Sequence, residues 1–231
     1  MLDVENLDLY YGQSQILFGM SLHAAKGQIT TVIGNNGAGK TSLLKAIAGR
    51  HPMSAGQVSL GGEPLRMTNA VDAARAGIAY VPQGREVFPM MSVLENLQTG
   101  FACLPKPDHF IPDRIYELFP VLKDMQTRRG GDLSGGQQQQ LAIARALISQ
   151  PRVLLLDEPT EGIQPNIIQQ IGDALQQLRQ AGEMAIVLVE QNASFAFGSG
   201  DSFVVVEGGR IKRTAHKADY SIELLKKDLA L

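Results

Sequence analysis

Residues 34–41 have types and a spacing that would let several of them bind one anion. They read Gly-Asn-Asn-Gly-Ala-Gly-Lys-Thr and fit the pattern G-x-x-x-x-G-K-[ST]. Glycines let the backbone turn tightly enough for successive N–H groups to face inward, and a helix that starts at the loop adds its dipole. The residues predicted to form this cradle for nucleotide phosphates are Gly34, Asn35, Asn36, Gly37, Ala38, Gly39, Lys40, Thr41 and Ser42.

Two side chains of this loop have the chemistry that nucleotide phosphates require. Lys40 is predicted to neutralise the β- and γ-phosphates, and Thr41 to place its hydroxyl on Mg²⁺, with Ser42 as a secondary candidate. The loop lies between a continuous apolar run, residues 29–33, and a segment whose apolar residues share one helical face. Because the pattern requires this strand–loop–helix context, the sequence predicts that the chain binds ATP with Mg²⁺.

Two acidic residues follow another apolar run, residues 153–156. Ligands bind at the carboxyl ends of parallel strands, and carboxylates there need partners because unpaired burial is costly. Asp157 is predicted to hold the coordination shell of Mg²⁺ through water, and Glu158 to orient and deprotonate the attacking water. The alternative, a surface acid pair that ends a strand, is much weaker beside a phosphate loop.

A second candidate anion site lies in residues 133–137, which read Leu-Ser-Gly-Gly-Gln and precede a helix predicted over residues 138–148. Ser134 and the backbone of Gly135 and Gly136 are predicted to bind phosphate at the start of that helix, with Gln137 beside them. One nucleotide cannot use both anion sites within one molecule.

Residues 133–137 resemble the signature sequence of ABC (ATP-binding cassette) proteins, and the resemblance covers essentially the whole chain. In that family two cassettes form a head-to-tail dimer, and each signature closes on the nucleotide of the other cassette. The resemblance therefore implies an ATPase that converts ATP and water to ADP and phosphate. It also implies a second ATPase subunit as partner, either a different chain or another copy of this one.

The same resemblance assigns roles to two further residues. Tyr11, just before Gly12, matches the aromatic residue that stacks on adenine, although Tyr10 beside it and a packing role both remain open. Gln83, which follows a predicted strand over residues 78–81, matches the glutamine whose amide oxygen can touch Mg²⁺ while its loop joins two lobes.

Two positions depart from the family pattern. Many ABC ATPases have a histidine after the strand predicted at residues 184–189, and this chain has Gln191 instead. Its amide can donate a hydrogen bond to the γ-phosphate but does not titrate near neutral pH. Residues 160–165 occupy the next family loop without its usual Ser-Ala-Leu-Asp pattern, so no role is carried over to them.

The elements that must position these residues predict an α/β chain with a mostly parallel core sheet, and the resemblance implies the P-loop ATPase fold of ABC proteins. Residues 29–33, 153–156 and 184–189 are too continuously apolar to have a wet face, which is typical of buried parallel strands. Alternating segments near the start of the chain, and glycine pairs after residues 57–60 and 203–206, predict antiparallel strands and hairpins.

Strand signals are missing from residues 84–150, whereas helix signals such as the Ser92 and Glu95 capping-box spacing are frequent there. We therefore expect one ABC ATPase domain over residues 1–231. Its core and antiparallel β subdomain occupy residues 1–83 and 151–231, and a helical subdomain that carries the signature occupies residues 84–150.

Composition limits the partners and the compartment. The formal net charge is −2 from 21 basic and 23 acidic residues, which does not suggest nucleic-acid binding. Cys103 is the single cysteine, so it forms no internal disulfide, and it has no metal-ligand spacing around it. No apolar run reaches the roughly 18 residues that span a bilayer. These features predict a cytoplasmic chain, and the resemblance to ABC proteins implies that it is bound peripherally at the inner face of the membrane.

The cargo is indicated by resemblance alone. Residues 81–85, 116–120 and 188–192 resemble the ATPases of importers for branched-chain amino acids and amides, while residues 128–140 and 158–165 look most like the E-type ATPase of bacterial urea importers. The resemblance implies membrane permease subunits and, indirectly, a periplasmic solute-binding protein. The alternatives are a leucine, isoleucine and valine importer and a soluble ABC ATPase without a transport role. The apolar segment 88–93, beside Gln83, favours contact with a membrane subunit, although packing within the helical lobe would explain it equally well.

Overall fold

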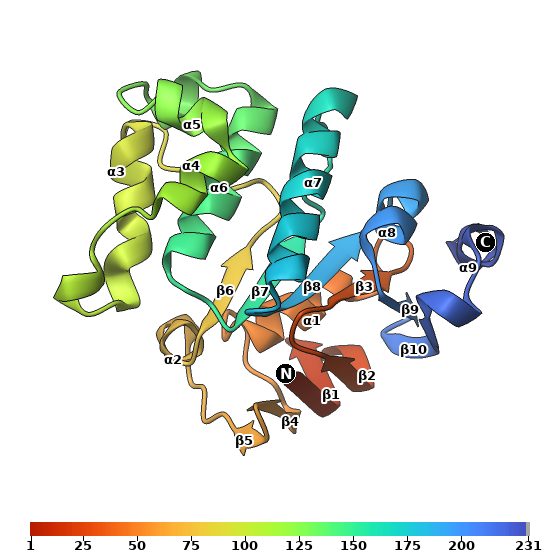
Figure 1. Cartoon of the computed structure of the whole chain (residues 1–231). Coiled ribbons are helices and arrows are strands. Elements are labelled where there is room, and N and C mark those ends of the chain that lie inside the picture. Colours follow the sequence, from red (N-terminus) through yellow and green to blue (C-terminus); the bar gives the residue numbers. More distant parts are fainter. Residues whose placement is uncertain (230–231) are drawn as a thin grey trace.

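Strands and helices of this chain form three layers (Figure 1), described by a computed structural model over residues 1–229. The strands are β1 (Leu2–Tyr11), β2 (Ser14–Ala24), β3 (Ile29–Ile33), β4 (Ala55–Leu60), β5 (Glu63–Pro64), β6 (Ile78–Val81), β7 (Val153–Asp157), β8 (Ala185–Glu190), β9 (Ser202–Glu207) and β10 (Arg210–His216). The α-helices are α1 (Lys40–Ile47), α2 (Ala70–Arg75), α3 (Val93–Gln98), α4 (Asp113–Leu118), α5 (Pro120–Asp124), α6 (Gly135–Ile148), α7 (Pro165–Ala181), α8 (Ala193–Ser199) and α9 (Ile222–Leu229).

The central layer is a six-stranded sheet with the order β10-β9-β3-β8-β7-β6. Every pair from β9 to β6 is parallel, and only β10 runs antiparallel to its neighbour β9. All residues of β3, β7 and β8 are buried, which confirms the buried parallel strands predicted from the apolar runs. Strand β8 begins one residue later than expected and includes Glu190, a buried acid at its carboxyl end.

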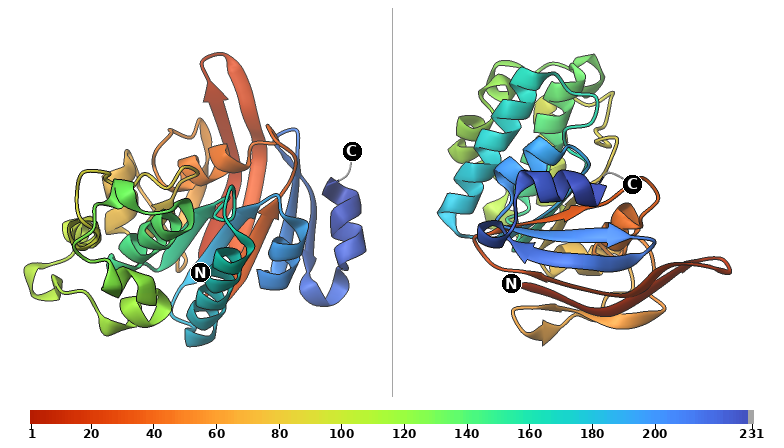
Figure 2. Two further views of the ribbon diagram at one scale, coloured as in Figure 1. Left: turned by 90° about the horizontal axis from the view of Figure 1, so that it is seen from above. Right: turned by 90° about the vertical axis from the view of Figure 1, so that its right-hand side faces the viewer.

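The faces of this sheet contact different layers because successive side chains of a strand point to opposite sides. Val153 and Leu155 of β7 pack in a cluster with α1 and the four-stranded antiparallel sheet β2-β1-β4-β5. Leu154 and Leu156 pack on the other side with residues of α3 to α7. Figure 2 shows the β1–β2 hairpin extending past the rest of the chain. The α/β architecture with an antiparallel sheet is therefore as predicted.

Two local expectations need correction. The alternating residues near the start belong to one strand, β1, which is interrupted by a register shift where Asn6 has a φ of 48°. Helix α6 begins at Gly135, three residues before the predicted start at 138, because Ser134 and Gln137 form a capping box that extends the helix. The signature segment is thus the first turn of the helix itself.

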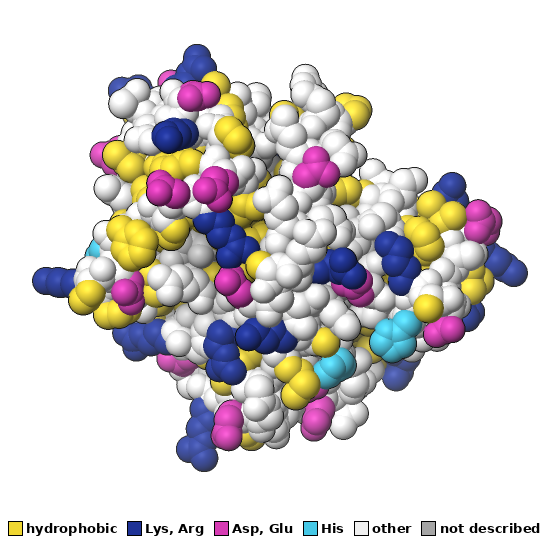
Figure 3. All heavy atoms as spheres, viewed as in Figure 1, with side chains coloured by type: hydrophobic (Ala, Val, Ile, Leu, Met, Phe, Trp, Pro, Cys, Tyr) yellow, Lys and Arg dark blue, Asp and Glu magenta, His cyan; other side chains and the backbone are white. Residues whose placement is uncertain are grey.

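Helices α3 to α6 lie together on one side of the molecule (Figure 1), and residues between β6 and β7 form no strand in the described chain. The capping box of Ser92 and Glu95 is present at the start of α3, as predicted. None of the helices within residues 1–229 combines the length and apolar character needed to cross a membrane. Basic and acidic side chains are interspersed on the face shown in Figure 3.

The carboxylate of Asp201 joins the amino end of β3 to the end of α7. It accepts hydrogen bonds from the Ile29 backbone N–H at 2.9 Å and from Nε and Nη2 of Arg179 at 2.7 and 2.6 Å. Since β3 runs from Ile29 to Ile33, this ion pair lies at the edge of the sheet opposite the loop that starts at Gly34.

Candidate nucleotide-binding and catalytic site

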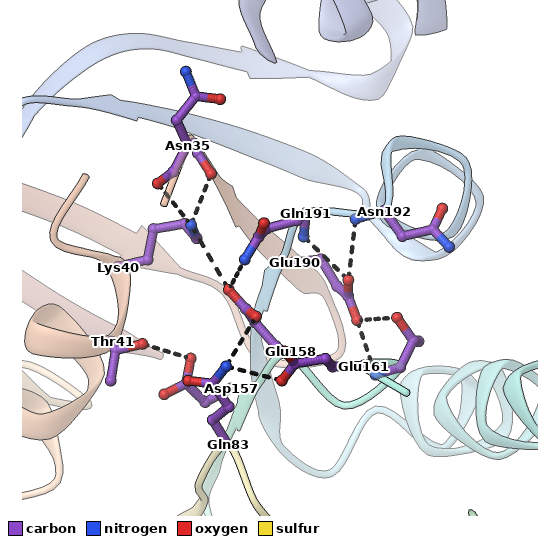
Figure 4. A network of polar contacts seen from close by, with 12 residues as sticks. Asn35, Lys40, Thr41, Gln83, Asp157, Glu158, Glu161, Glu190, Gln191 and Asn192 are labelled. Carbon is purple, nitrogen blue, oxygen red and sulfur yellow. Dashed lines mark hydrogen bonds and ion pairs between the residues drawn. The ribbon is translucent and has the colours of Figure 1, made fainter. Parts of the chain in front are cut away.

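Loops that follow four neighbouring parallel strands meet at one edge of the central sheet. Strand β3 leads to the glycine-rich loop, β6 to Gln83, β7 to Glu158 and β8 to Gln191. Figure 4 shows Lys40, Glu158 and Gln191 pointing toward one another from three of these loops. The carboxyl edge of a parallel sheet is where ligands bind in such folds, so this cluster is the candidate site.

The glycine-rich loop needs its glycines for space as well as for backbone conformation. A Cβ at Gly34 would collide with the carbonyl oxygen of Val206, and one at Gly39 would lie 2.6 Å from Cδ2 of Leu17. Gly39 is the N-cap of α1 with a φ of 104°, and no side chain caps the helix there. The N–H groups of the first helical turn are therefore left for an anion.

Lys40 is held inside this loop. Its side chain is 4% exposed, and its Nζ donates to the carbonyl oxygens of Gly34 at 2.7 Å and Asn35 at 3.0 Å. Nζ also lies 3.8 Å from Oε1 of Glu158. Burial lowers the pKa of Lys40, while the nearby carboxylates oppose that shift. The ammonium is thus placed between the loop and the acidic strand ends.

Other predicted residues of the loop differ in exposure. Asn36 and Gly37 are exposed, whereas Ala38 is buried and its carbonyl oxygen accepts from the Gly209 backbone N–H at 3.0 Å. Ser42 is half-buried, one position after Thr41 on α1. The loop is therefore anchored through Ala38 and open to solvent at its tip.

Asp157 is 1% exposed and accepts two side-chain hydrogen bonds. Thr41 Oγ1 donates to its Oδ1 at 3.1 Å, and Tyr80 Oη donates to its Oδ2 at 3.0 Å. Burial raises the pKa of Asp157, and the two hydrogen bonds oppose that shift. Burial and the adjacent Asp157 charge raise the pKa of Tyr80, so its hydroxyl remains a donor.

Tyr80 was not among the predicted site residues. The sequence does contain one indication of its role: Tyr80 is the polar side chain of the otherwise apolar strand β6, and a buried tyrosine hydroxyl needs a hydrogen-bond partner. Which acid would serve as that partner is not visible in the sequence, since 77 positions separate Tyr80 from Asp157.

The oxygen donors at this edge suit Mg²⁺. The Thr41 hydroxyl and the Asp157 carboxylate are already in contact, and Gln83 lies on the adjoining loop. Hard cations prefer such oxygen ligands, and Mg²⁺ commonly takes only one or two protein groups and completes its shell with substrate phosphates and water. The described residues contain no cluster of three or more His, Cys, Asp or Glu residues with metal-binding geometry. The Thr41 and Asp157 oxygens fit a site for Mg²⁺ whose remaining ligands would be phosphate oxygens and water.

Glu158 has a constrained backbone conformation. Its φ is 48°, a left-handed value that is rare and strained for a residue other than glycine, and its N–H donates to the Val189 carbonyl oxygen at 2.9 Å. Its side chain is 9% exposed and accepts from Nε2 of Gln191 on Oε1. Nε2 of Gln83 approaches Oε2 at 3.4 Å. Glu158 is therefore brought together with Lys40, Gln83 and Gln191.

Gln83 has a second partner that sequence analysis missed. Its Nε2 donates to Oε2 of Glu161 at 2.8 Å, a shorter contact than the one with Glu158. Glu161 lies in the segment 160–165 that lacks the family pattern. Glu190 at the end of β8 was missed too, because at this strand end the family pattern assigned a role only to the position of Gln191.

The predicted anion site at Ser134, Gly135, Gly136 and Gln137 lies apart from this cluster, at the start of α6. Ser134 accepts from the Gln137 N–H at 3.4 Å, and the Gln137 side chain accepts from the Ser134 N–H at 2.9 Å. Within residues 1–229, no hydrogen bond joins these four residues to the glycine-rich loop. A Cβ at Gly136 would lie 2.8 Å from Cγ2 of Ile167, so this helix start packs tightly against α7.

Tyr11 lies at the end of β1, is 42% exposed and meets the ring of His51 edge-on, with ring centroids 4.4 Å apart. His51 was not among the predicted site residues, and its ring lies beside Tyr11. Tyr10 instead donates its hydroxyl to Oε1 of Gln15 at 2.8 Å. Of the two tyrosines, Tyr11 is the one that forms an exposed aromatic pair.

Comparison with known proteins gives a consistent result. The family model described as ABC transporter matches residues 17–161. The chain is 44% identical to the high-affinity branched-chain amino acid transport ATP-binding protein BraG of Pseudomonas aeruginosa, over 91% of each chain. It is 37% identical to the probable branched-chain amino acid transport ATP-binding protein LivF of Archaeoglobus fulgidus, over 91% of this chain and 90% of that one. A dimeric bacterial ABC transporter cassette shares the fold, with a TM-score of 0.82 at 22% identity over 95% of this chain and 100% of that one.

Substitution of Tyr80 by Phe should raise the Mg²⁺ concentration needed for nucleotide binding and hydrolysis by about 10-fold. This is the lower end of the range usually found when a residue that orients a metal ligand is removed. The ring stays in place, and only the hydroxyl that donates to Asp157 is lost. Titration of Mg²⁺ at fixed ATP measures this shift, with Tyr116→Phe as the control because Tyr116 lies on α4 in the helical layer. Equal Mg²⁺ dependence in wild type and Tyr80→Phe would contradict a role for the hydroxyl.

Proposed function

Because the chain belongs to the ABC transporter family, we propose that it is the ATP-hydrolysing subunit of an importer for branched-chain amino acids. ABC ATPases of this kind hydrolyse ATP to energise transport, and this chain does so as a member of the family. The assignment of residues to ATP binding and hydrolysis rests on one observation. The side chains of Lys40, Thr41, Asp157 and Glu158 meet at the carboxyl ends of the parallel strands.

ATP binding is assigned to the residues of the glycine-rich loop. The uncapped N–H groups at the start of α1 and the ammonium of Lys40 hold the β- and γ-phosphates, and Tyr11 stacks on the adenine. Thr41, Asp157 and the amide oxygen of Gln83 would hold Mg²⁺, which supplies charge stabilisation at the phosphates when it is bound. These groups fix the nucleotide with its γ-phosphate toward Glu158.

Hydrolysis is assigned to Glu158 as the general base for water. Its carboxylate lies next to Lys40, so it faces the place where the γ-phosphate would be held. Gln191 donates to Glu158 and orients it, and the same amide can donate to the γ-phosphate. Since an amide does not titrate near neutral pH, the proton from water goes to Glu158 rather than to the Gln191 position.

The second nucleotide-binding element is assigned to a partner cassette. Ser134, Gly135, Gly136 and Gln137 form a helix start apart from the phosphate cluster, and a head-to-tail dimer would place it on the nucleotide of the other subunit. A dimeric cassette has the same fold. The partner is a second ABC ATPase subunit, either a different chain in the assembled transporter or another copy of this chain.

The branched-chain amino acid cargo is favoured over urea. Residues 128–140 and 158–165 led the sequence analysis to urea first, with a leucine, isoleucine and valine importer as the alternative. Both relatives described above, which match this chain over about nine-tenths of its length, are named as branched-chain amino acid transport ATP-binding proteins. The names support the alternative, and the cargo itself is bound by other subunits of such transporters.

A cavity of about 650 Å³ beside Gln83 supports a transport role over that of a soluble ABC ATPase. It is lined by Tyr80, Glu86, Phe88 and Arg145, and Phe88 is 47% exposed. Met90, on the same segment, is 72% exposed. We propose that a helix of a permease subunit docks here, with the chain bound peripherally at the cytoplasmic face of the membrane.

Hydrogen bonds and cation–π contacts between residues that line this cavity fix their conformation. Arg50 binds Glu86 through Nη1–Oε1 and Nη2–Oε2 contacts of 3.1 and 2.8 Å, and its guanidinium lies 5.3 Å from the centroid of the Tyr80 ring. Arg145 donates to the Glu86 carbonyl oxygen at 2.8 Å and lies 5.3 Å from the Phe88 ring. Glu86 itself has a left-handed φ of 48°. The loop after Gln83 therefore has a defined resting conformation beside the proposed docking surface.

Separate loss of phosphate binding and of water activation tests the ATPase assignment. Lys40→Ala should abolish measurable ATP binding or hydrolysis, because it removes the buried ammonium between loop and phosphates. Glu158→Gln should retain ATP binding and lose turnover by about 10²-fold or more, the usual contribution of a general base. Nucleotide titration and phosphate release measure the two effects. Wild-type turnover in Glu158→Gln would remove the base assignment.

A bulky cation at Ser134 tests whether the site is shared between two chains. Ser134→Arg should leave the ATP affinity of the isolated chain unchanged, because Ser134 lies apart from the glycine-rich loop. Turnover in the assembled transporter should fall by about 10²-fold or more, the usual effect of losing an oxyanion donor. Titration at low protein concentration and turnover of the complex are the two measurements. If monomer binding falls as far as it does in Lys40→Ala, the signature acts within its own chain.

Uptake by the reconstituted transporter tests the cargo. The chain, its partner ATPase, the permease subunits and the binding protein are placed in liposomes, with ATP on the side of the ATPase. Labelled leucine should accumulate in an ATP-dependent manner and labelled urea should not. The same complex with Glu158→Gln is the matched control for transport that does not need hydrolysis. Uptake of urea without leucine would return the assignment to the urea importer.

A further inference from the structure

A buried carboxylate next to the catalytic cluster has no part in the mechanism above. Glu190 ends β8 and is 2% exposed. Burial raises its pKa, and the hydrogen bonds that it accepts oppose that shift. Retaining an acid at such a position is costly unless its oxygens are fully used. Its contacts therefore indicate what it contributes.

Each oxygen of Glu190 binds one of two loops. Oε1 accepts from the backbone N–H and the hydroxyl of Thr160 at 3.2 and 2.8 Å. Oε2 accepts from the backbone N–H groups of Gln191 and Asn192 at 3.1 and 3.2 Å. Figure 4 shows this carboxylate between the loop after β8 and the loop after β7. All four partners donate, so the position requires a side chain that only accepts.

The two loops held by Glu190 are the ones that carry Glu158 and Gln191. Thr160 follows Glu158 by two residues, and Gln191 donates its side-chain amide to Glu158. The contacts thus close a ring that runs from Glu158 through Thr160 and Glu190 to Gln191 and back to Glu158. A left-handed φ such as the 48° of Glu158 persists only where neighbouring contacts enforce it.

We propose that Glu190 is a positioning residue for hydrolysis: its carboxylate ties the two loops together so that Glu158 keeps its strained backbone and its aim at the γ-phosphate. This inference rests on the proposed role of Glu158. None of the four hydrogen bonds of Glu190 is to a residue of the phosphate cradle. It acts on water activation through Glu158 and Gln191, and the hydrogen bonds of Lys40 and Thr41 do not involve it.

Glu190→Gln is the first test. Glutamine has nearly the same shape as glutamate, but one carboxylate oxygen is replaced by an NH₂ group, which would face two hydrogen-bond donors. The turnover number kcat of the assembled ATPase should fall by about 10-fold or more, as expected for a displaced catalytic group. The KM for ATP and the affinity for ADP should stay within about twofold of wild type, because the contacts of Lys40 and Thr41 are unchanged. A parallel loss of nucleotide affinity and kcat would overturn the inference.

Thr160 provides a second, smaller perturbation of the same ring. Thr160→Val removes the hydroxyl that donates to Glu190 and preserves the buried side-chain volume, so kcat should fall without a change in KM. Thr160→Ser keeps the hydroxyl and should restore turnover relative to Val. Equal kcat values for the Val and Ser variants would contradict a role of the Thr160–Glu190 hydrogen bond in hydrolysis. This pair also tests the inference if Glu190→Gln does not fold.

Asp201→Asn controls for general loss of stability. The Asp201 carboxylate likewise accepts hydrogen bonds from a backbone N–H, that of Ile29, and from a side chain of another element, that of Arg179 on α7. These contacts lie at the opposite edge of the sheet. Its substitution should lower the unfolding midpoint and leave kcat within about twofold of wild type, consistent with independence of distant sites. If it lowers kcat as much as Glu190→Gln does, the Glu190 effect is structural and the inference fails.

Glu158→Gln separates this inference from the proposed function. If Glu158→Gln keeps wild-type turnover, the proposed base is wrong and the Glu190 inference falls with it. If Glu158→Gln loses turnover while Glu190→Gln retains it, the proposed function stands and only the positioning role is overturned.

Discussion

Three carboxylates crowd the carboxyl ends of two neighbouring strands, and the loops around them are arranged to supply each with its own donors. Asp157 accepts from Thr41 and Tyr80, Glu158 from Gln191, and Glu190 from Thr160 and backbone N–H groups. Like charges this close repel in a poorly solvated setting, so the positions of the surrounding loops depend on satisfying them. Among the described residues, Lys40 is the one cation that forms an ion pair with Glu158. The site is therefore preorganised by the requirement to keep three acids stable side by side.

The local parts of this arrangement were predictable from the sequence because they depend on neighbours along the chain. Strand β3 has the predicted bounds, since an apolar run between polar residues carries its own signal. The glycine-rich loop is equally local: backbone turns and a helix start are specified by eight consecutive residues. The early start of α6 was missed because the Ser134 and Gln137 capping box, although visible in the sequence, was interpreted only as an anion site.

Contacts that join distant segments were not predictable. Tyr80 and Asp157 meet only because β6 and β7 are adjacent and parallel, and Glu161 reaches Gln83 across 78 positions. Glu190 had no distinguishing pattern, since its role depends on which loop lies opposite the end of β8. Periodicity indicates which face of an element is buried, but pairing between polar groups depends on the order of strands in the sheet. The roles of Ser134 and of its neighbours depend further on a second chain.

Tyr80 contributes to two different parts of the structure. Its ring lines the cavity beside Gln83, with the Arg50 guanidinium over it, and its hydroxyl binds the carboxylate of Asp157. In genetic terms the position is pleiotropic: one substitution changes both the wall of a cavity and the environment of an acid at the strand edge. Phenotypes of large or small replacements at Tyr80 consequently combine two causes, and a second-site suppressor on either side would repair only one of them.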